Sequence, residues 1–157
     1  MKSVYIETSI PNYLTAHPSK DVTGAAWQQI TYQWWHEEKN KFDLFVSELV
    51  IKEASNGNPD AAQRRMNSLE DIPALPIDQD IAEFAKKLIS GGGIPQSSEA
   101  DALHVAIASI HRMDYLLTWN CRHINNAVTK PIIRSLCEKA GYLFPEICSP
   151  YELLSEE

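Results

Sequence analysis

The chain has 157 residues, 44% hydrophobic and 22% charged, which are ordinary proportions for one soluble globular domain. Its net charge of −7 argues against a protein that coats nucleic acid by charge alone. That charge is compatible with an enzyme whose acids bind metal ions, or with a protein that has a basic partner.

No run of about 18 apolar residues predicts a transmembrane helix. An acid at position 7 comes too early for a signal peptide, so we expect a cytoplasmic protein. The cysteines are three in number and form no Cys-x-x-Cys pair, which favours reduced thiols over disulfides or a zinc site.

Short β-rich runs alternate with helical patterns along the whole chain. We expect strands at residues 3–6, 42–46, 115–118 and 142–144, and an extended or edge segment at residues 72–77. We expect helices at residues 10–14, 25–39, 48–54, 59–69, 79–90, 98–108, 131–140 and 149–154. This alternation predicts a single α/β domain over residues 1–157. Its central sheet is expected to be mostly parallel, with four to five strands and helices on both faces.

The segment Ser98-Glu99-Ala100-Asp101-Ala102-Leu103-His104-Val105-Ala106-Ile107-Ala108 organises this interpretation. Its helical projection is apolar on one face and places Asp101 and His104 on the other, flanked by Val105 and Ala108. A helix covered on both sides would hold Asp101 in a cleft, where a metal ion is one candidate partner. The alternative is a capping box, in which Asp101 only bonds back to the start of the helix.

Further oxygen ligands follow the predicted strands. Glu7 ends the first strand, Glu53 lies on the helix after the second, and Asn120 follows the third. Ligands of parallel sheets gather at the carboxyl ends of the strands, and hard divalent ions prefer oxygen ligands. For each acid alone there is an alternative to a metal ligand: Glu7 is then an exposed acid at the end of a strand, and Glu53 is then a solvated position on a helix.

Aromatic residues concentrate in the second helix, where Trp27, Ile30 and Trp34 recur at helical spacing and Trp35 adds a further ring. No Lys or Arg interleaves with them, which favours core packing or a dimer surface over base stacking. We therefore expect a homodimer.

Four pieces of this chain, in order, resemble the PIN-domain family, and within it the VapC-type toxins of bacterial toxin–antitoxin pairs. They are Val4-Tyr5-Ile6-Glu7-Thr8-Ser9, Val46-Ser47-Glu48-Leu49-Val50-Ile51-Lys52-Glu53, Asp101-Ala102-Leu103-His104-Val105-Ala106-Ile107-Ala108 and Leu116-Leu117-Thr118-Trp119-Asn120. The closing Ser149-Pro150-Tyr151-Glu152-Leu153-Leu154 is also similar to the end of that family. The resemblance implies a PIN-like α/β/α sandwich, and a homodimeric endoribonuclease that uses Mg²⁺ or Mn²⁺ and is inhibited by a small antitoxin protein.

Carried onto this sequence, the resemblance implies that Glu7, Glu53 and Asp101 hold the metal and that Asn120 orients the metal or a water. Behind them it places supporting side chains, namely Thr8, Glu99, His104 and Thr118, with His104 expected in that role or in core packing rather than as a ligand. Arg122 and His123 are candidates for contact with RNA, as are Arg64, Arg65 and Lys130, and for each of these a solvated surface position is the alternative.

The family usually has Asp where this chain has Glu7 and Asn120. The longer side chain of Glu7 shifts its carboxylate, and the amide of Asn120 offers an oxygen without charge. The alternative function is therefore a weakened or inactive PIN-like module that binds RNA or protein.

Overall fold

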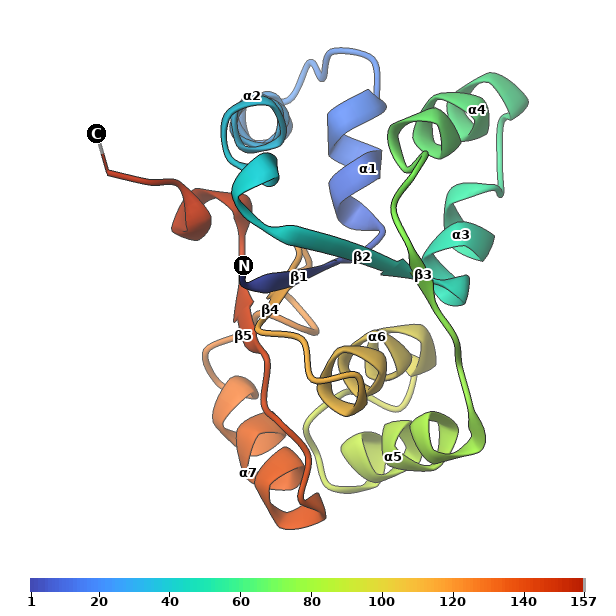
Figure 1. Ribbon diagram of the computed structural model, residues 1–157, viewed down its shortest axis with the longest axis vertical. Coiled ribbons are helices and arrows are strands. Elements are labelled where there is room, and N and C mark those ends of the chain that lie inside the picture. The colour runs from blue at the N-terminus through green and yellow to red at the C-terminus, as the bar shows by residue number, and fades with distance from the viewer. Residues whose placement is uncertain (157) are drawn as a thin grey trace.

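Five parallel strands form one sheet with the order β3-β2-β1-β4-β5 in the computed structural model, which describes residues 1–156 (Figure 1). The central strand is β1 (Ser3–Ile6); β2 (Asp43–Ser47) and β3 (Ala74–Leu75) lie on one side of it, and β4 (Tyr115–Leu117) and β5 (Glu146–Cys148) on the other. The α/β fold with a parallel sheet is thus confirmed, and the extended segment predicted at residues 72–77 contains an edge strand.

Helices cover both faces of this sheet (Figure 1). One layer contains α1 (Ser9–Thr15), α2 (Val22–Glu37) and α4 (Pro59–Ser68), while α3 (Glu48–Ala54) directly follows β2. The other layer contains α5 (Gln79–Ser90), α6 (Glu99–Ile110) and α7 (Lys130–Ala140). Two short 3₁₀ helices, η1 (Lys39–Lys41) and η2 (Pro150–Leu153), complete the described elements. Because both faces are covered, the central strand β1 is buried along most of its length, and Val4, Tyr5 and Ile6 are fully buried.

The order of the strands reverses between β1 and β4. The chain moves outward from β1 to β2 and β3, and then returns to build β4 and β5 on the other side of β1. The N–H of Glu7 donates to the carbonyl of Leu117 over 3.1 Å, so the carboxyl ends of β1 and β4 lie side by side. In open parallel sheets such a switch point is where ligands bind.

Local signals set most element boundaries where they were predicted. The hydroxyl of Ser47 accepts from the N–H of Val50 and begins α3, and the carboxylate of Asp78 accepts from the N–H of Ile81 and begins α5. Gly141 ends α7 in the left-handed conformation, with φ of 77°, which a side chain would disfavour.

The strand predicted at residues 142–144 is wrong, because the last strand is β5, which begins at Glu146. The carbonyl of Leu143 accepts from the hydroxyl of Ser109, and the ring of Tyr142 packs against Phe84. Pro145 has no N–H to donate, so the ladder with β4 begins only after it. The apolar pattern that indicated a strand belongs to a segment that packs through its side chains.

The second helix begins at Val22, three residues before the predicted start at Ala25. Asp21 is its N-cap, and the Asp21 carboxylate accepts from the N–H of Gly24. The weak helix propensity of Gly24 had masked this first turn, which the cap stabilises.

The aromatic residues of α2 pack into the core, as expected. Trp34 is 0% exposed and Trp35 5%, while the ring of Trp27 stacks on Trp119 with 4.6 Å between centroids. The apolar surface offered to a second copy therefore does not come from Trp34 and Trp35, and the homodimer stays a prediction.

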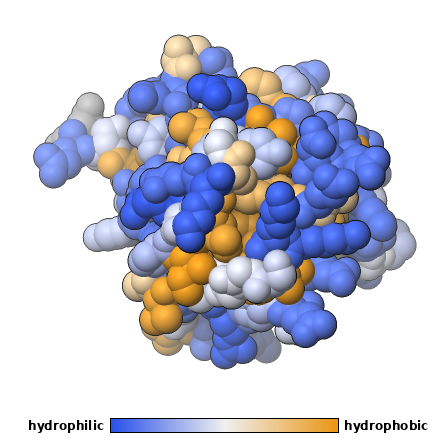
Figure 2. Space-filling view, turned by 90° about the horizontal axis from the view of Figure 1, so that it is seen from below, coloured by the Kyte–Doolittle hydropathy of each residue, from blue (hydrophilic) through white to orange (hydrophobic). Residues whose placement is uncertain are grey.

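Figure 2 shows apolar patches among polar groups on the face seen from below, the side of α5 and α7. Exposed apolar side chains of this region include Ile132 on α7 and Leu143 after it. Within residues 1–156, none of the helices has the length and apolar character needed to cross a membrane.

Candidate functional site

Glu7 follows the last residue of β1, at the point where the strand order reverses, and is 6% exposed. Its Oε1 accepts from the hydroxyl of Ser9 and from the hydroxyl of Thr118, each over 2.6 Å. Its Oε2 accepts from the N–H of Ser9 over 3.1 Å. Since Thr118 follows β4, these bonds fix the carboxylate across the switch point of the sheet.

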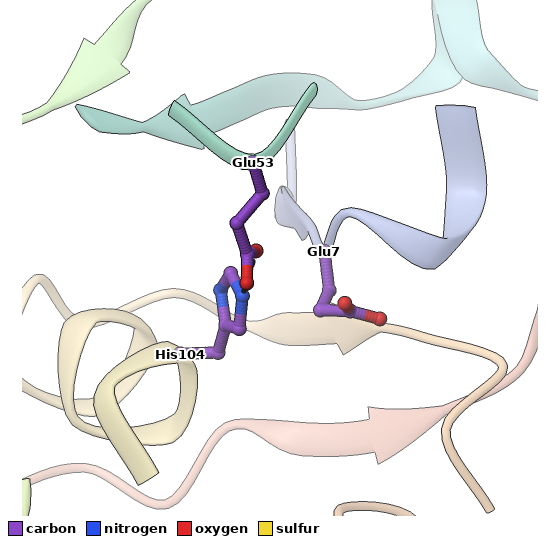
Figure 3. A group of neighbouring side chains, drawn as sticks. All are labelled: Glu7, Glu53 and His104. Carbon is purple, nitrogen blue, oxygen red and sulfur yellow. Dashed lines mark hydrogen bonds and ion pairs between the residues drawn. The ribbon is translucent and has the colours of Figure 1, made fainter. Parts of the chain in front are cut away.

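Glu53 lies on α3 and reaches down to α6, where it meets the ring of His104, with Glu7 beside them (Figure 3). Its Oε1 accepts from the hydroxyl of Thr8 and from Nε2 of His104, the latter over 2.7 Å. One ligand atom from each of Glu7, Glu53 and His104 lies within 4.8 Å of the other two. Three elements far apart in the sequence thus bring two carboxylates and one imidazole together.

A buried line of hydrogen bonds continues behind His104. Its Nδ1 lies 2.7 Å from the hydroxyl of Tyr5, and that hydroxyl lies 2.8 Å from the hydroxyl of Ser47. A carboxylate only accepts, so Nε2 donates to Glu53, and in the neutral ring Nδ1 accepts from Tyr5. Tyr5 and Ser47 are fully buried and His104 is 1% exposed. Both ring nitrogens are therefore engaged, which fits a role in holding Glu53 in place.

The charges of this group shift its pKa values. Burial lowers the pKa of His104, but the hydrogen bond to Glu53 and the charges of Glu7, Glu53 and Asp101 outweigh burial and raise it overall. Burial raises the pKa of Glu53, but the bonds and charge of His104 and the Thr8 hydroxyl lower it overall. Chiefly through burial, the pKa of Tyr5 is well above its usual value, so its hydroxyl stays neutral.

Asp101 stands one turn before His104 on α6 and contacts a different partner. Its Oδ2 lies 3.1 Å from Nδ1 of His123, which also lies 3.0 Å from the hydroxyl of Ser98. The N–H of His123 donates to Oδ1 of Asn120 over 3.0 Å. The capping box considered as an alternative is not formed, because the Ser98 side chain makes no capping bond to the helix.

The predicted residues thus fall into two neighbouring sets. Glu7 and Glu53 come together with His104, whereas Asp101 and Asn120 each form a hydrogen bond to His123. α6 is covered on both sides, as its sequence predicted, with residues such as Val105, Ala106 and Ala108 fully buried.

The supporting residues are divided. Thr8 and Thr118 donate to the two glutamates, as expected of side chains behind the ligands. Glu99 is exposed, as is Arg122, the candidate for contact with RNA, and neither makes a side-chain hydrogen bond or ion pair within residues 1–156.

Sequence reasoning missed the contributions of Tyr5, Ser9 and Ser47. A signal for Tyr5 was present: it lies two residues before Glu7 in an extended segment, and side chains at that spacing point to the same face of a sheet. The hydroxyl of Ser47 both caps α3 and contacts Tyr5, and only the first of these roles is indicated by its place before a helix.

The donor set of this group fits a divalent cation. Glu7 Oε2 accepts one bond, and Glu53 Oε2 accepts none within residues 1–156, so both oxygens keep lone pairs for a metal. Carboxylate oxygens suit Mg²⁺ and Mn²⁺, and a neighbouring imidazole is compatible with Mn²⁺. Glu7 is the more rigidly held of the two, because three hydrogen bonds fix its carboxylate.

No family model, no curated protein and no solved structure matches this chain. The chemistry of its own side chains therefore carries the functional conclusion.

Proposed function

We propose that this protein is a metal-dependent endoribonuclease of the PIN-like type that hydrolyses RNA phosphodiester bonds with Mg²⁺ or Mn²⁺. One observation carries the proposal: the carboxylates of Glu7 and Glu53 converge at the point where the strand order reverses. Two acids brought this close repel each other unless a cation or a proton lies between them. A divalent ion would relieve that repulsion.

Some residues of this group would bind the cation, and others orient the side chains that bind it. Glu7, Glu53 and Asp101 would hold the metal, which supplies Lewis acidity and lowers the pKa of a bound water. Ser9 and Thr118 fix Glu7, while Thr8 and His104 fix Glu53. Such outer partners determine how well ligands are oriented.

Asp101 contributes charge to the site, since its negative charge is among the causes that raise the pKa of His104. Asn120 fixes the loop after β4, because its Oδ1 accepts from the N–H of His123. Because Asp101 contacts the ring of the same His123, the Asn120 amide would orient a water or the metal from this loop.

The second candidate is a module that binds RNA or protein without cutting. The observation in its favour is Asn120, which brings no charge to a position where a fourth carboxylate would strengthen metal binding. Metal binding and cleavage together separate the two functions, because a site that takes up no divalent ion, or takes it up without cutting RNA, favours the module.

The expected partners follow from the same proposal. They are RNA as substrate, a small antitoxin protein as inhibitor, and a second copy in a homodimer within the cytoplasm. The net charge of −7 is compatible with a partner that is basic where it contacts this chain.

The decisive experiment measures cleavage of a mixed RNA pool with Mn²⁺, with Mg²⁺ and with EDTA. Glu53→Gln should lower cleavage and weaken Mn²⁺ binding in calorimetry. Glu138→Gln is the matched control, because it makes the same change of charge at an exposed position of α7. Wild-type protein that binds Mn²⁺ and leaves the RNA intact would support the module instead. Cleavage that persists in EDTA would contradict the metal-dependent mechanism.

A further inference from the structure

A cleft of about 460 Å³ opens beside the candidate metal group. Glu53 forms part of its wall, and the rest comes from the end of α1 and the segment after it, with Asn12 and His17, and from α4, with Arg64 and Arg65. Figure 1 shows α1 and α4 side by side in one layer, with α3 next to them. The cleft and the metal group therefore share one carboxylate.

The two arginines of the cleft use only part of their hydrogen-bonding capacity. Nε of Arg64 donates to the carbonyl of Thr15 over 3.0 Å. Nε of Arg65 donates to the carbonyl of Ala54 over 3.0 Å, and its second terminal nitrogen donates to that of Asn56. Within residues 1–156 neither arginine forms an ion pair with a carboxylate.

These bonds hold the arginines in place without neutralising them. A guanidinium has five N–H donors, and Arg64 uses one of them in the described structure. The carbonyl of Thr15 belongs to the last turn of α1, so Arg64 also compensates the negative end of that helix. The remaining N–H groups of Arg64, which are half-buried with the side chain, are available to an anion.

We propose that this cleft binds a phosphate of the RNA chain beside the bond that is cut, with Arg64 as its principal ligand. The proposal rests on the ribonuclease function above and names where its substrate lies. In a chain with a net charge of −7, an RNA strand needs local positive charge, and here two unpaired guanidiniums lie next to a candidate metal ligand.

The shared wall couples this cleft to the metal group. The carboxylate of Glu53 repels a phosphate, and a divalent ion bound to Glu53 would remove that repulsion. RNA and a divalent ion should therefore strengthen each other's binding by the same factor. We expect RNA to bind more tightly in Ca²⁺ than in EDTA.

The test is fluorescence anisotropy with an end-labelled, mixed-sequence single-stranded RNA and the full chain, in EDTA and in Ca²⁺. Arg64→Gln should raise the Kd about five- to tenfold and reduce the salt dependence by about 0.7 in the log–log slope. Arg134→Gln is the matched control, because Arg134 lies on α7 in the opposite layer and pairs with Glu146 at 4.0 Å. It should leave the Kd unchanged.

Ala61→Glu keeps the test decisive if Arg64→Gln does not fold. Ala61 lines the cleft in the first turn of α4, where an added acid is compatible with the helix but opposes a phosphate. It should also weaken RNA binding.

The proposal is overturned if a folded Arg64→Gln or Ala61→Glu keeps wild-type RNA affinity, or if Arg134→Gln weakens binding equally. It is also overturned if the wild-type chain binds no RNA in either buffer, or if an acidic peptide rather than RNA binds through Arg64. Binding that depends on Arg64 without any Mn²⁺-dependent cleavage would support the cleft while contradicting the nuclease. RNA cleavage together with an RNA affinity that does not depend on Arg64 would support the nuclease while contradicting the cleft.

Discussion

Replacing Tyr5 with Phe tests whether the buried hydrogen-bond line organises the site. The substitution removes one hydroxyl and keeps the ring that fills the core. That hydroxyl lies between Nδ1 of His104 and the hydroxyl of Ser47, at 2.7 and 2.8 Å, and all three residues are buried. Without it, both groups lose a partner that water cannot replace.

The expected cost follows from these contacts. Two buried hydrogen bonds contribute about 1 kcal/mol each, and an unsatisfied buried polar group adds about 1–3 kcal/mol, so Tyr5→Phe should lower the free energy of unfolding by about 3–5 kcal/mol. For a chain of this length, that corresponds to a Tm lower by about 6–20 °C. His104 is also released from one side, so Glu53 is held less firmly and Mn²⁺ affinity should fall about tenfold.

The assay pairs chemical unfolding of the metal-free protein with Mn²⁺ calorimetry well below the Tm. Tyr115→Phe is the control, because Tyr115 lies on the neighbouring strand β4 and its hydroxyl makes no hydrogen bond within residues 1–156. Equal losses of stability in both variants would refute the idea that the line stabilises the fold. A Tyr5→Phe protein with unchanged Mn²⁺ affinity would refute its role in holding Glu53.

Three further predictions concern the metal and the titrating groups. Mn²⁺ at about 100 times its Kd should stabilise the wild-type chain by about 2.7 kcal/mol in a melting experiment. Asp101→Asn should remove most of that stabilisation. An Asp101→Asn protein that is stabilised as much as the wild type would exclude Asp101 as a ligand. Asn120→Asp keeps the oxygen that accepts from His123 and adds a charge, so calorimetry should show tighter Mn²⁺ binding; unchanged affinity would place residue 120 outside the metal shell. The contribution of His104 to the free energy of unfolding is complete below about pH 6.5 and is lost as the pH rises through its raised pKa. The contribution of Glu53 is complete above about pH 4.5 and is lost as the pH falls through its lowered pKa. The urea midpoint of the metal-free protein should therefore decline on the alkaline side of this window, and His104→Gln should flatten that decline; an equally steep decline in the variant would show that other groups cause it.

The sequence by itself determined the fold class and most of the elements, because their signals are local. A strand followed by a cap and a helix is encoded within a few neighbouring residues, as at Ser47 between β2 and α3. The error at residues 142–144 arose where a long-range contact, from the hydroxyl of Ser109 to the carbonyl of Leu143, replaced strand pairing.

The site was determined only in part by the sequence. That Glu7 ends one strand and Glu53 lies on the helix after the next follows from the order of elements, and the parallel sheet then brings them to one edge. Which partner each side chain takes was decided by the tertiary structure. Asp101 and His104 are one helical turn apart, yet one contacts His123 and the other contacts Glu53 and Tyr5. Those partners lie 22, 51 and 99 residues away in the chain, and only the packing of α6 between its neighbours sets the directions in which they meet.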